Sequence, residues 1–128
     1  RQGVVNLTSG LFETANTFGM RLPELFCGFP RMAGEPPVAY PVACLPQAWA
    51  AGSVFMLLQA CLGVSVEAAR HRVRVTHPRL PRGIEAIHIA GLQVGESRFD
   101  LNVRRYGEDV VAFAQKDPGS AARVEMQL

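Results

Sequence analysis

The chain has 128 residues, 48% of them hydrophobic, which is enough for one domain with a core and excludes a disordered class. Thirteen Lys and Arg residues against eleven Asp and Glu residues leave a net charge of +2, too small to indicate a nucleic-acid or membrane partner. The first thirty residues contain no signal peptide with successive basic, apolar and small-residue regions. Because the cysteine count is also odd, we expect a reducing, cytoplasmic setting.

The cysteines are Cys27, Cys44 and Cys61, too evenly spread for a zinc framework, whose paired ligands lie about two to four residues apart. We expect no metal and no other cofactor. A thiol nucleophile would need a histidine base within reach, but all three histidines follow residue 70. Buried free thiols are therefore the expected role of the cysteines.

The first predicted helix covers Asn6 to Gly19, where apolar residues recur three and four positions apart and mark one face: Leu7, Leu11, Phe12, Ala15 and Phe18. Gly19 is the expected end of this helix. The chain begins with Arg1 and enters the periodic segment within a few residues, so we expect a fragment of a longer protein.

Six prolines between residues 20 and 46 exclude a continuous helix there and predict extended or turning backbone. A loop of this length in a compact domain is usually functional or disordered. Its interleaved apolar and aromatic side chains, Phe26, Phe29, Tyr40 and Val42, argue against disorder. We therefore expect the functional chemistry in this loop.

Pro46 suits the first position of a second predicted helix, which ends at Gly63. Apart from Gln47, Ser53 and Gln59, its residues are apolar around the whole circumference, so the helix is expected to be surrounded by protein. It is shorter than the roughly 20 apolar residues that a membrane span needs. We expect it inside a layered helical structure.

Beyond residue 70 the hydrophobic period changes to two, which is typical of strands, and the strands are predicted at residues 71–77, 86–94, 98–104, 109–115 and 122–128. Tyr106 and Gly107 are expected to turn the chain between two of them. The pattern predicts a small antiparallel sheet with one solvated face. The whole sequence therefore predicts an α+β fold, with a helical part at residues 1–70 and a β part at residues 71–128.

The stretch RLPELFCGFPR, residues 21–31, places Glu24 between a proline and apolar side chains. An acid in such a setting loses hydration unless it is hydrogen-bonded, and the same setting tunes carboxylates for acid or base work. Taken singly, Glu24 is interpreted as a structural or exposed acid, Gln47 as a first-turn polar residue and Trp49 as a core aromatic. Together, a carboxylate, an amide donor and an aromatic face suit a pyranose sugar.

The string RLPELFCGFPR…GEPPVAYPVACLPQAWAAGSVFMLLQACLG resembles the last part of the catalytic domain of bacterial amylo-α-1,6-glucosidases, glycogen-debranching-like proteins of the six-hairpin glycosidase group. The likeness is closest from Leu7 to Gly63, continues through RVRVTHPRLPRGIEAIHIAGLQVGESRFDLNVRR and weakens after Tyr106. Its most specific part is the pairing of PELF with PQAW across the proline-rich loop. Leu45 departs from the small polar residue expected before the proline.

The resemblance implies that residues 1–70 end an (α/α)6 toroid whose activity is inverting hydrolysis of α-1,6-linked glucose by two carboxylates. Glu24 falls on the position of the family's general base, and Gln47, Trp49 and Tyr40 are the substrate-binding candidates. Inverting enzymes hold their two carboxylates about 6.5–9.5 Å apart so that water fits between carboxylate and sugar. The general acid is expected outside these 128 residues, so the isolated chain is expected to be inactive.

Other charged residues have plainer interpretations. Glu35, the rival carboxylate in the loop, is flanked by Gly34 and Pro36 and is predicted to be a solvated turn residue. Residues 70–82 contain five arginines, two histidines and no acid, but no interleaved aromatic residue that would indicate a nucleic-acid site. They predict a solvated strand face, or one that pairs with acids of the missing protein. His88 is predicted to be exposed.

An alternative function is a non-catalytic binding or assembly module, in which the helical half only packs and the sheet meets a partner. A reading frame that extends several hundred residues upstream would favour the hydrolase. For the hydrolase we expect a glucan or oligosaccharide substrate, with neither nucleic acid nor membrane as a partner. Because the second helix is apolar all round, the isolated chain is expected to form a homodimer.

Overall fold

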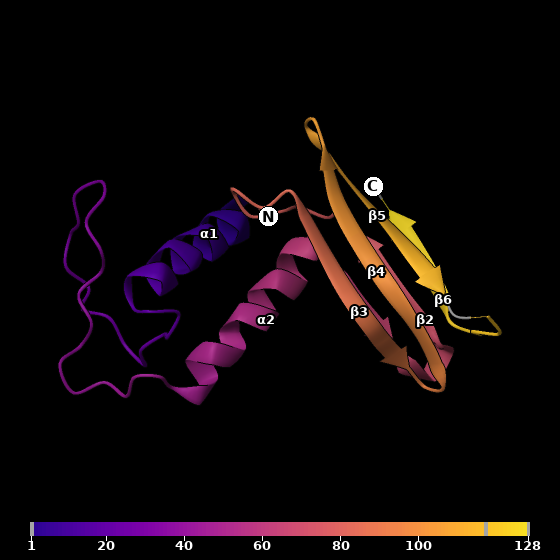
Figure 1. Ribbon diagram of the computed structural model, residues 1–128, viewed down its shortest axis with the longest axis horizontal. Coiled ribbons are helices and arrows are strands. Elements are labelled where there is room, and N and C mark those ends of the chain that lie inside the picture. Colours follow the sequence, from indigo (N-terminus) through magenta and orange to yellow (C-terminus); the bar gives the residue numbers. More distant parts are fainter. Residues whose placement is uncertain (1, 117, 128) are drawn as a thin grey trace. The chain divides into compact units, whose positions relative to one another are not determined.

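The computed structural model describes residues 2–116 and 118–127, so the last residue of the strand predicted at 122–128 lies outside these ranges. Within them the chain forms two helices followed by six strands, which confirms the predicted α+β class (Figure 1). The chain divides into two compact units, Gln2–Leu58 and Gln59–Leu128. The expected division between residues 70 and 71 lies inside the second unit, because a strand before residue 70 already pairs with one after it.

Helix α1 spans Gln2–Thr17, four residues earlier at its start than the periodicity predicts. Its buried residues are Val5, Thr8, Ser9, Thr14 and Ala15, whereas Leu7 on the predicted apolar face is 57% exposed. The hydroxyl groups of Thr8, Ser9 and Thr14 can be buried because each donates a hydrogen bond to the carbonyl four residues earlier, at 2.7 to 2.9 Å. The predicted apolar face is therefore only partly the buried one.

Helix α2 spans Ala48–Leu62 and ends at Gly63, as predicted. Gly63 has a φ of 62°, a left-handed conformation that glycine adopts at little cost and that commonly ends helices. Pro46 lies outside the helix rather than at its first position, because Gln47 is the cap whose carbonyl accepts the N–H of Ala51 at 3.0 Å. A small cluster of Ala15, Leu22 and Ala50, with Leu11 and Val54 beside it, joins the helices.

The β part forms two three-stranded sheets rather than the single predicted sheet. The first holds β1 (Val64–Glu67), β2 (Arg72–Thr76) and β6 (Arg123–Gln127), in the order β1-β2-β6. The second is the antiparallel meander of β3 (Ala86–Val94), β4 (Ser97–Tyr106) and β5 (Asp109–Lys116). Strand β1 was not predicted, because it has only four residues. Strand β6 pairs with β2 in parallel, so the prediction of an antiparallel sheet is wrong for this pair.

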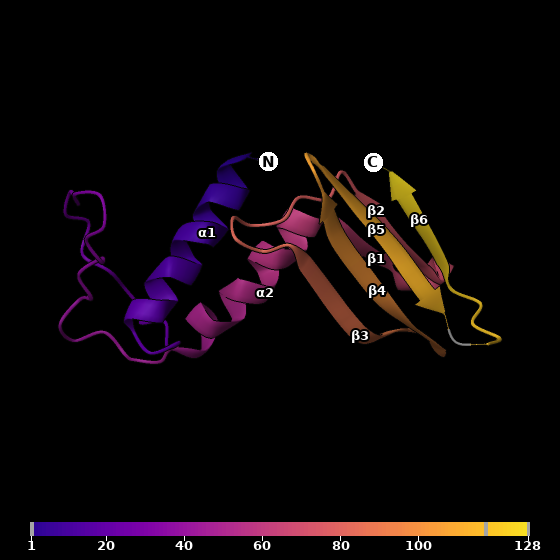
Figure 2. The same cartoon turned by 45° about the horizontal axis from the view of Figure 1, so that its top comes forward.

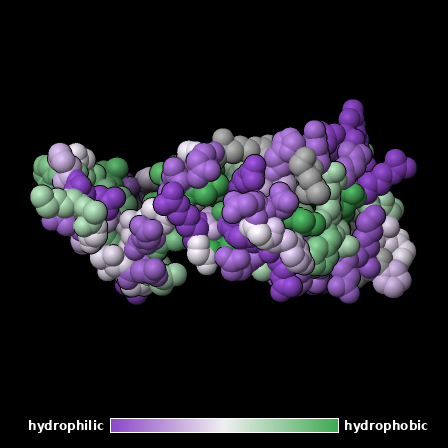
Figure 3. Space-filling model, turned by 90° about the horizontal axis from the view of Figure 1, so that it is seen from above, coloured by the Kyte–Doolittle hydropathy of each residue, from purple (hydrophilic) through white to green (hydrophobic). Residues whose placement is uncertain are grey.

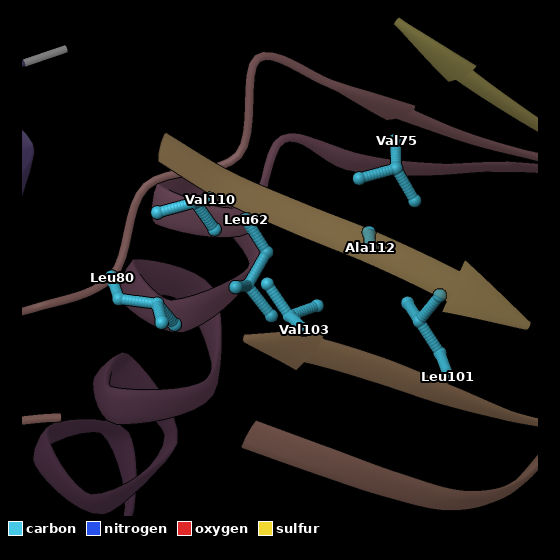
Figure 4. Packing of buried hydrophobic residues seen from close by; sticks show 7 residues of the cluster. All are labelled: Leu62, Val75, Leu80, Leu101, Val103, Val110 and Ala112. Atoms are coloured by element: carbon cyan, nitrogen blue, oxygen red, sulfur yellow. The ribbon is translucent and has the colours of Figure 1, made fainter. Parts of the chain in front are cut away.

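The core of the second unit lies between these sheets, which face one another (Figure 2). Inward side chains of both sheets and the end of α2 meet in its larger cluster, which Figure 4 shows: Leu62, Val75, Leu80, Leu101, Val103, Val110 and Ala112. Along β4 buried residues alternate with more accessible ones from Ser97 to Val103. The predicted solvated face is therefore present, but on each of two sheets.

Candidate functional site

The proline-rich loop folds back on itself, so that its two limbs, residues 22–27 and 38–47, run antiparallel. Backbone hydrogen bonds of 2.8 to 3.3 Å join them, from Gln47 to Leu22, Glu24 to Cys44, Tyr40 to Leu25 and Cys27 to Val38. An isolated bridge between Phe26 and Ala39 lies among these bonds, and the ring of Phe26 contacts that of Phe18 edge to face, with centroids 5.7 Å apart. The extended backbone that the prolines predict is thus present and paired.

Glu24 is fastened to the opposite limb by its backbone and by its side chain. Its N–H donates to the carbonyl of Cys44 at 2.9 Å, and its Oε2 accepts the N–H of Cys44 at 3.4 Å. The side chain is half-buried. A carboxylate held in this way has a defined position and still reaches solvent, which is what a base that activates a water molecule requires.

Gln47 and Trp49 lie where the second limb enters α2. The Oε1 atom of Gln47 accepts the N–H of Ala48 at 3.0 Å, so the amide oxygen serves the helix start and only its NH₂ group can donate to a ligand. Trp49 is 59% exposed, so the interpretation of this residue, taken singly, as a core aromatic is wrong. An exposed indole face is available for stacking against a sugar ring.

Tyr40 lies on the limb opposite Leu25 and is 47% exposed. The limb pairing therefore places Glu24, Tyr40 and Gln47 on facing segments of one loop, with Trp49 in the first turn of the helix that follows. Figure 3 shows apolar surface at the left, where Figure 1 draws this loop. Other large apolar side chains of the loop are also exposed, namely Leu25, Phe29, Met32, Val38, Val42 and Leu45. The loop thus presents an apolar, aromatic surface around one tethered carboxylate.

A cavity of about 520 Å³ lies away from these residues, between α1 and the tip of the loop. It is lined by Glu13, Thr14 and Thr17 of the helix and by Arg31 and Glu35 of the loop tip. Glu35 is exposed and its Oε2 accepts the N–H of Met32 at 3.0 Å, which agrees with a solvated turn residue. Glu13 and Arg31 are not among the predicted site residues. The spacing of Gly10, Glu13 and Thr17 places these three on one helix face, a signal that could have indicated Glu13.

The three cysteines differ in exposure. Cys61 is buried, Cys27 is half-buried and Cys44 is exposed, and all three are free thiols. The expectation of packed thiols is therefore correct for Cys61 and wrong for Cys44, whose backbone is engaged by Glu24 while its side chain is exposed. Within residues 2–116 and 118–127, no group of three or more His, Cys, Asp or Glu side chains could hold a metal ion.

The arginines of β2 find their acidic partners within the chain. Glu67 of β1 contacts Arg72 at 2.5 Å and Arg74 at 3.4 Å, while Glu125 of β6 contacts Arg72 at 3.1 Å and Arg74 at 3.6 Å. The hydrogen bond from Arg72 holds the pKa of Glu67 below its ordinary value. These four residues form a charge network across three strands, so the arginines of β2 need no acids from outside the chain to neutralise them.

His88 is exposed, as predicted, and lies on the second sheet. Its Nδ1 is 2.7 Å from Oδ1 of Asn102 and its Nε2 is 3.4 Å from a carboxylate oxygen of Asp100. Asn102 is the residue of β4 directly opposite His88 on β3, and Asp100 lies two residues further along β4. They give the histidine a structural role in the sheet.

Comparisons of the chain with protein-family models, with curated proteins and with solved structures returned no significant match. No helix in the described parts of the chain is long and apolar enough to cross a membrane. The assignment of a function therefore depends on the motif resemblance and on the geometry of the loop.

Proposed function

We propose that this chain is the C-terminal part of a glycoside hydrolase that acts on α-1,6-linked glucose, with Glu24 as the general base of an inverting reaction. In this proposal residues 1–70 end an (α/α)6 toroid, Tyr40, Gln47 and Trp49 contact the glucan, and the general acid comes from outside the 128 residues. The observation that carries the proposal is the double attachment of Glu24 to Cys44, which holds a solvent-reaching carboxylate between the PELF and PQAW limbs.

The chemistry assigned to each side chain follows from its atoms. The Glu24 carboxylate accepts a proton from water as the water oxygen attacks the anomeric carbon, and the bond to the leaving oxygen breaks as the general acid protonates it. The indole of Trp49 and the phenol of Tyr40 offer faces for a sugar ring, and the NH₂ group of Gln47 can donate to a hydroxyl. None of these steps requires a metal or an organic cofactor.

The decisive experiment uses the longer protein that the reading frame around this sequence encodes. Glu24→Gln should lower kcat/KM for an α-1,6-linked glucan by about 100-fold or more, because it removes a base and keeps the shape. Glu35→Gln is the matched control, since it makes the same change at an exposed acid of the same loop, and it should retain most activity. Retention of more than a tenth of the turnover by Glu24→Gln would reject the role.

Chemical rescue separates a base from a residue that merely holds the loop. In Glu24→Gly an added azide ion can occupy the place of the water and attack the anomeric carbon directly, since azide needs no deprotonation. Activity should return with rising azide, and the product should be the β-glucosyl azide, the inverted configuration. Loss of activity without rescue, combined with a lowered melting temperature, would show that Glu24 is structural.

The non-catalytic alternative is favoured by one observation. The side-chain oxygen of Gln47 and one oxygen of Glu24 are both engaged by backbone N–H groups, as expected for groups that shape a loop. A binding module predicts that the longer protein binds its partner equally well with Glu24→Gln. A hydrolase predicts that glucan binding persists while turnover is lost.

A further inference from the structure

A second cavity, of about 350 Å³, adjoins the cavity between α1 and the tip of the loop. Its apolar lining comes from α1 and from the loop: Leu7, Leu11, Phe26 and Phe29. The two cavities share Gly10, Thr14, Arg31 and Pro37, and all their lining residues belong to the unit Gln2–Leu58. Together they form one trough along α1, with a charged end and an apolar end.

At the charged end, the tip of the loop is a closed turn. The N–H of Glu35 donates to the carbonyl of Met32 at 3.2 Å, and Oε2 of Glu35 accepts the N–H of Met32 at 3.0 Å. Nη1 of Arg31 donates to the carbonyl of Glu35 at 3.2 Å. Within residues 2–116 and 118–127, the second carboxylate oxygen of Glu35 and the carboxylate of Glu13 on α1 have no partner. The turn therefore fixes the loop side chains and leaves polar atoms available to a ligand.

These groups suit a ligand that both donates and accepts hydrogen bonds. A carboxylate only accepts and a guanidinium only donates, whereas each hydroxyl of a sugar does both. A zwitterion would gain little, because Glu13, Arg31 and Glu35 are exposed and water screens exposed ion pairs. At the other end of the trough, Phe29 is 66% exposed and offers an aromatic face for the C–H side of a pyranose ring.

We infer that the trough binds a segment of a neutral oligosaccharide, with hydroxyl groups on Glu13, Arg31 and Glu35 and a sugar ring on Phe29. The adjoining cavities of about 520 and 350 Å³ each lie within the roughly 300–1,000 Å³ of ligand pockets, and their end-to-end arrangement suits successive rings of a chain. Among the described residues, the trough and the candidate catalytic site have none in common. The identity of the sugar as an α-1,6-linked glucan rests on the proposed function.

Titration of the isotope-labelled chain with isomaltohexaose, an α-1,6-linked glucan, tests the inference by NMR. The amides of Gly10, Thr14 and Gly34 should shift saturably. Glu24→Gln should bind equally well, so a failure of the proposed catalytic role would leave this result intact. The inference is overturned by no saturable shift of these amides up to about 10 mM sugar. Shifts with the zwitterion phenylalanine but not with the sugar would also overturn it.

Gly10 offers the sharpest variant, because it lines both cavities and an added Cβ would meet nothing within 4 Å. Gly10→Gln should obstruct the trough and weaken sugar binding at least tenfold while keeping the helix, since glutamine favours helix more than glycine. Gly3→Gln is the matched control: it makes the same change at an equally open position of α1 that lines neither cavity, and it should bind as the parent chain does.

Arg31→Gln should also weaken binding about tenfold, because hydrogen bonds from a charged donor are lost. Circular dichroism checks that each variant keeps its helices. Equal sugar affinity in Gly10→Gln, Gly3→Gln and the parent chain, with unchanged circular dichroism, would show that the sugar does not occupy the trough.

Discussion

At the scale of single residues, Glu67 determines how the charges of the first sheet are arranged. Its carboxylate contacts Arg70 at 3.3 Å as well as Arg72 and Arg74, and it is 30% exposed. Arg72 is 19% exposed, and its Nε is buried without a hydrogen-bond partner. The network therefore neutralises a crowded group of arginines on β2 and just before it, although its partial exposure limits its contribution to stability.

The network makes stability depend on pH in a predictable direction. The hydrogen bond from Arg72 lowers the pKa of Glu67 from its ordinary value of 4.5. The folded state then favours the ionised carboxylate, so the stabilisation is present above about pH 4.5 and is lost as the pH falls through the lowered pKa. Glu67→Gln should lower the urea midpoint at pH 7, and its difference from the parent chain should shrink as the pH falls below 4.5.

A control for this effect is Glu108→Gln, which removes an exposed acid in the turn between β4 and β5. The difference in urea midpoint between Glu108→Gln and the parent chain should not shrink in this way as the pH falls. A carboxyl titration by NMR gives the pKa of Glu67 directly. A value at or above 4.5 would contradict the contact with Arg72 in solution.

At the scale of elements, the end of α2 depends on one glycine. The N–H of Thr76 in β2 donates to the carbonyl of Gly63 at 3.1 Å, so the chain after the helix passes close to a strand. A Cβ atom on Gly63 would lie 2.1 Å from the carbonyl oxygen of Thr76. Both the left-handed backbone and the close approach require glycine at this position.

Gly63→Ala should therefore lower the free energy of unfolding by on the order of 3–5 kcal/mol, because backbone atoms must move. Gly107→Ala is a close control: its φ of 61° nearly equals the 62° of Gly63, but an added Cβ meets nothing within 4 Å. This control should cost only the conformational strain, about 1–2 kcal/mol. Equal losses in urea unfolding would show that the approach to Thr76 is not tight.

At the scale of the whole molecule, the two compact units have cores of unequal size. Sixteen hydrophobic residues are buried in the described ranges, and only four of them belong to Gln2–Leu58, namely Val5, Ala15, Leu22 and Ala50. Those four are mostly small, whereas the other unit buries Phe99 and Leu101 almost completely. Because burial of apolar area supplies most of the stabilisation, the helical unit is expected to open more readily.

Native-state hydrogen exchange measures this difference. Amides of β4, which is paired on both sides, should be protected at least a hundredfold more than amides of α1. Leu101→Ala should lower the protection of β4 by about 2–5 kcal/mol, since it leaves a cavity between the sheets. Comparable protection of α1 and β4 in the parent chain would mean that the helical unit is as stable as the β unit.

Much of the secondary structure could be predicted because its signals are local. Gly63 and Gly107 mark a helix end and a turn through their own backbone freedom, and the period of two located five strands to within about two residues at each end. The proline-rich segment 20–46 was recognised as a loop for the same reason. Of the candidate site, the sequence identified Glu24 and its neighbours by motif, whereas their facing positions followed from hydrogen bonds between the limbs.

What the sequence by itself determined is thus the order of the two helices and five of the six strands, and the residues that could carry chemistry. Only the tertiary structure decided that the strands divide into two sheets, that β6 joins β2 in parallel, and that Arg72 meets Glu125, a residue 53 positions away. It also decided that α1 buries Thr8 and leaves Leu7 exposed. The physical reason is that periodicity reports on neighbours along the chain, whereas pairing and burial depend on distant segments that compete for the same surface.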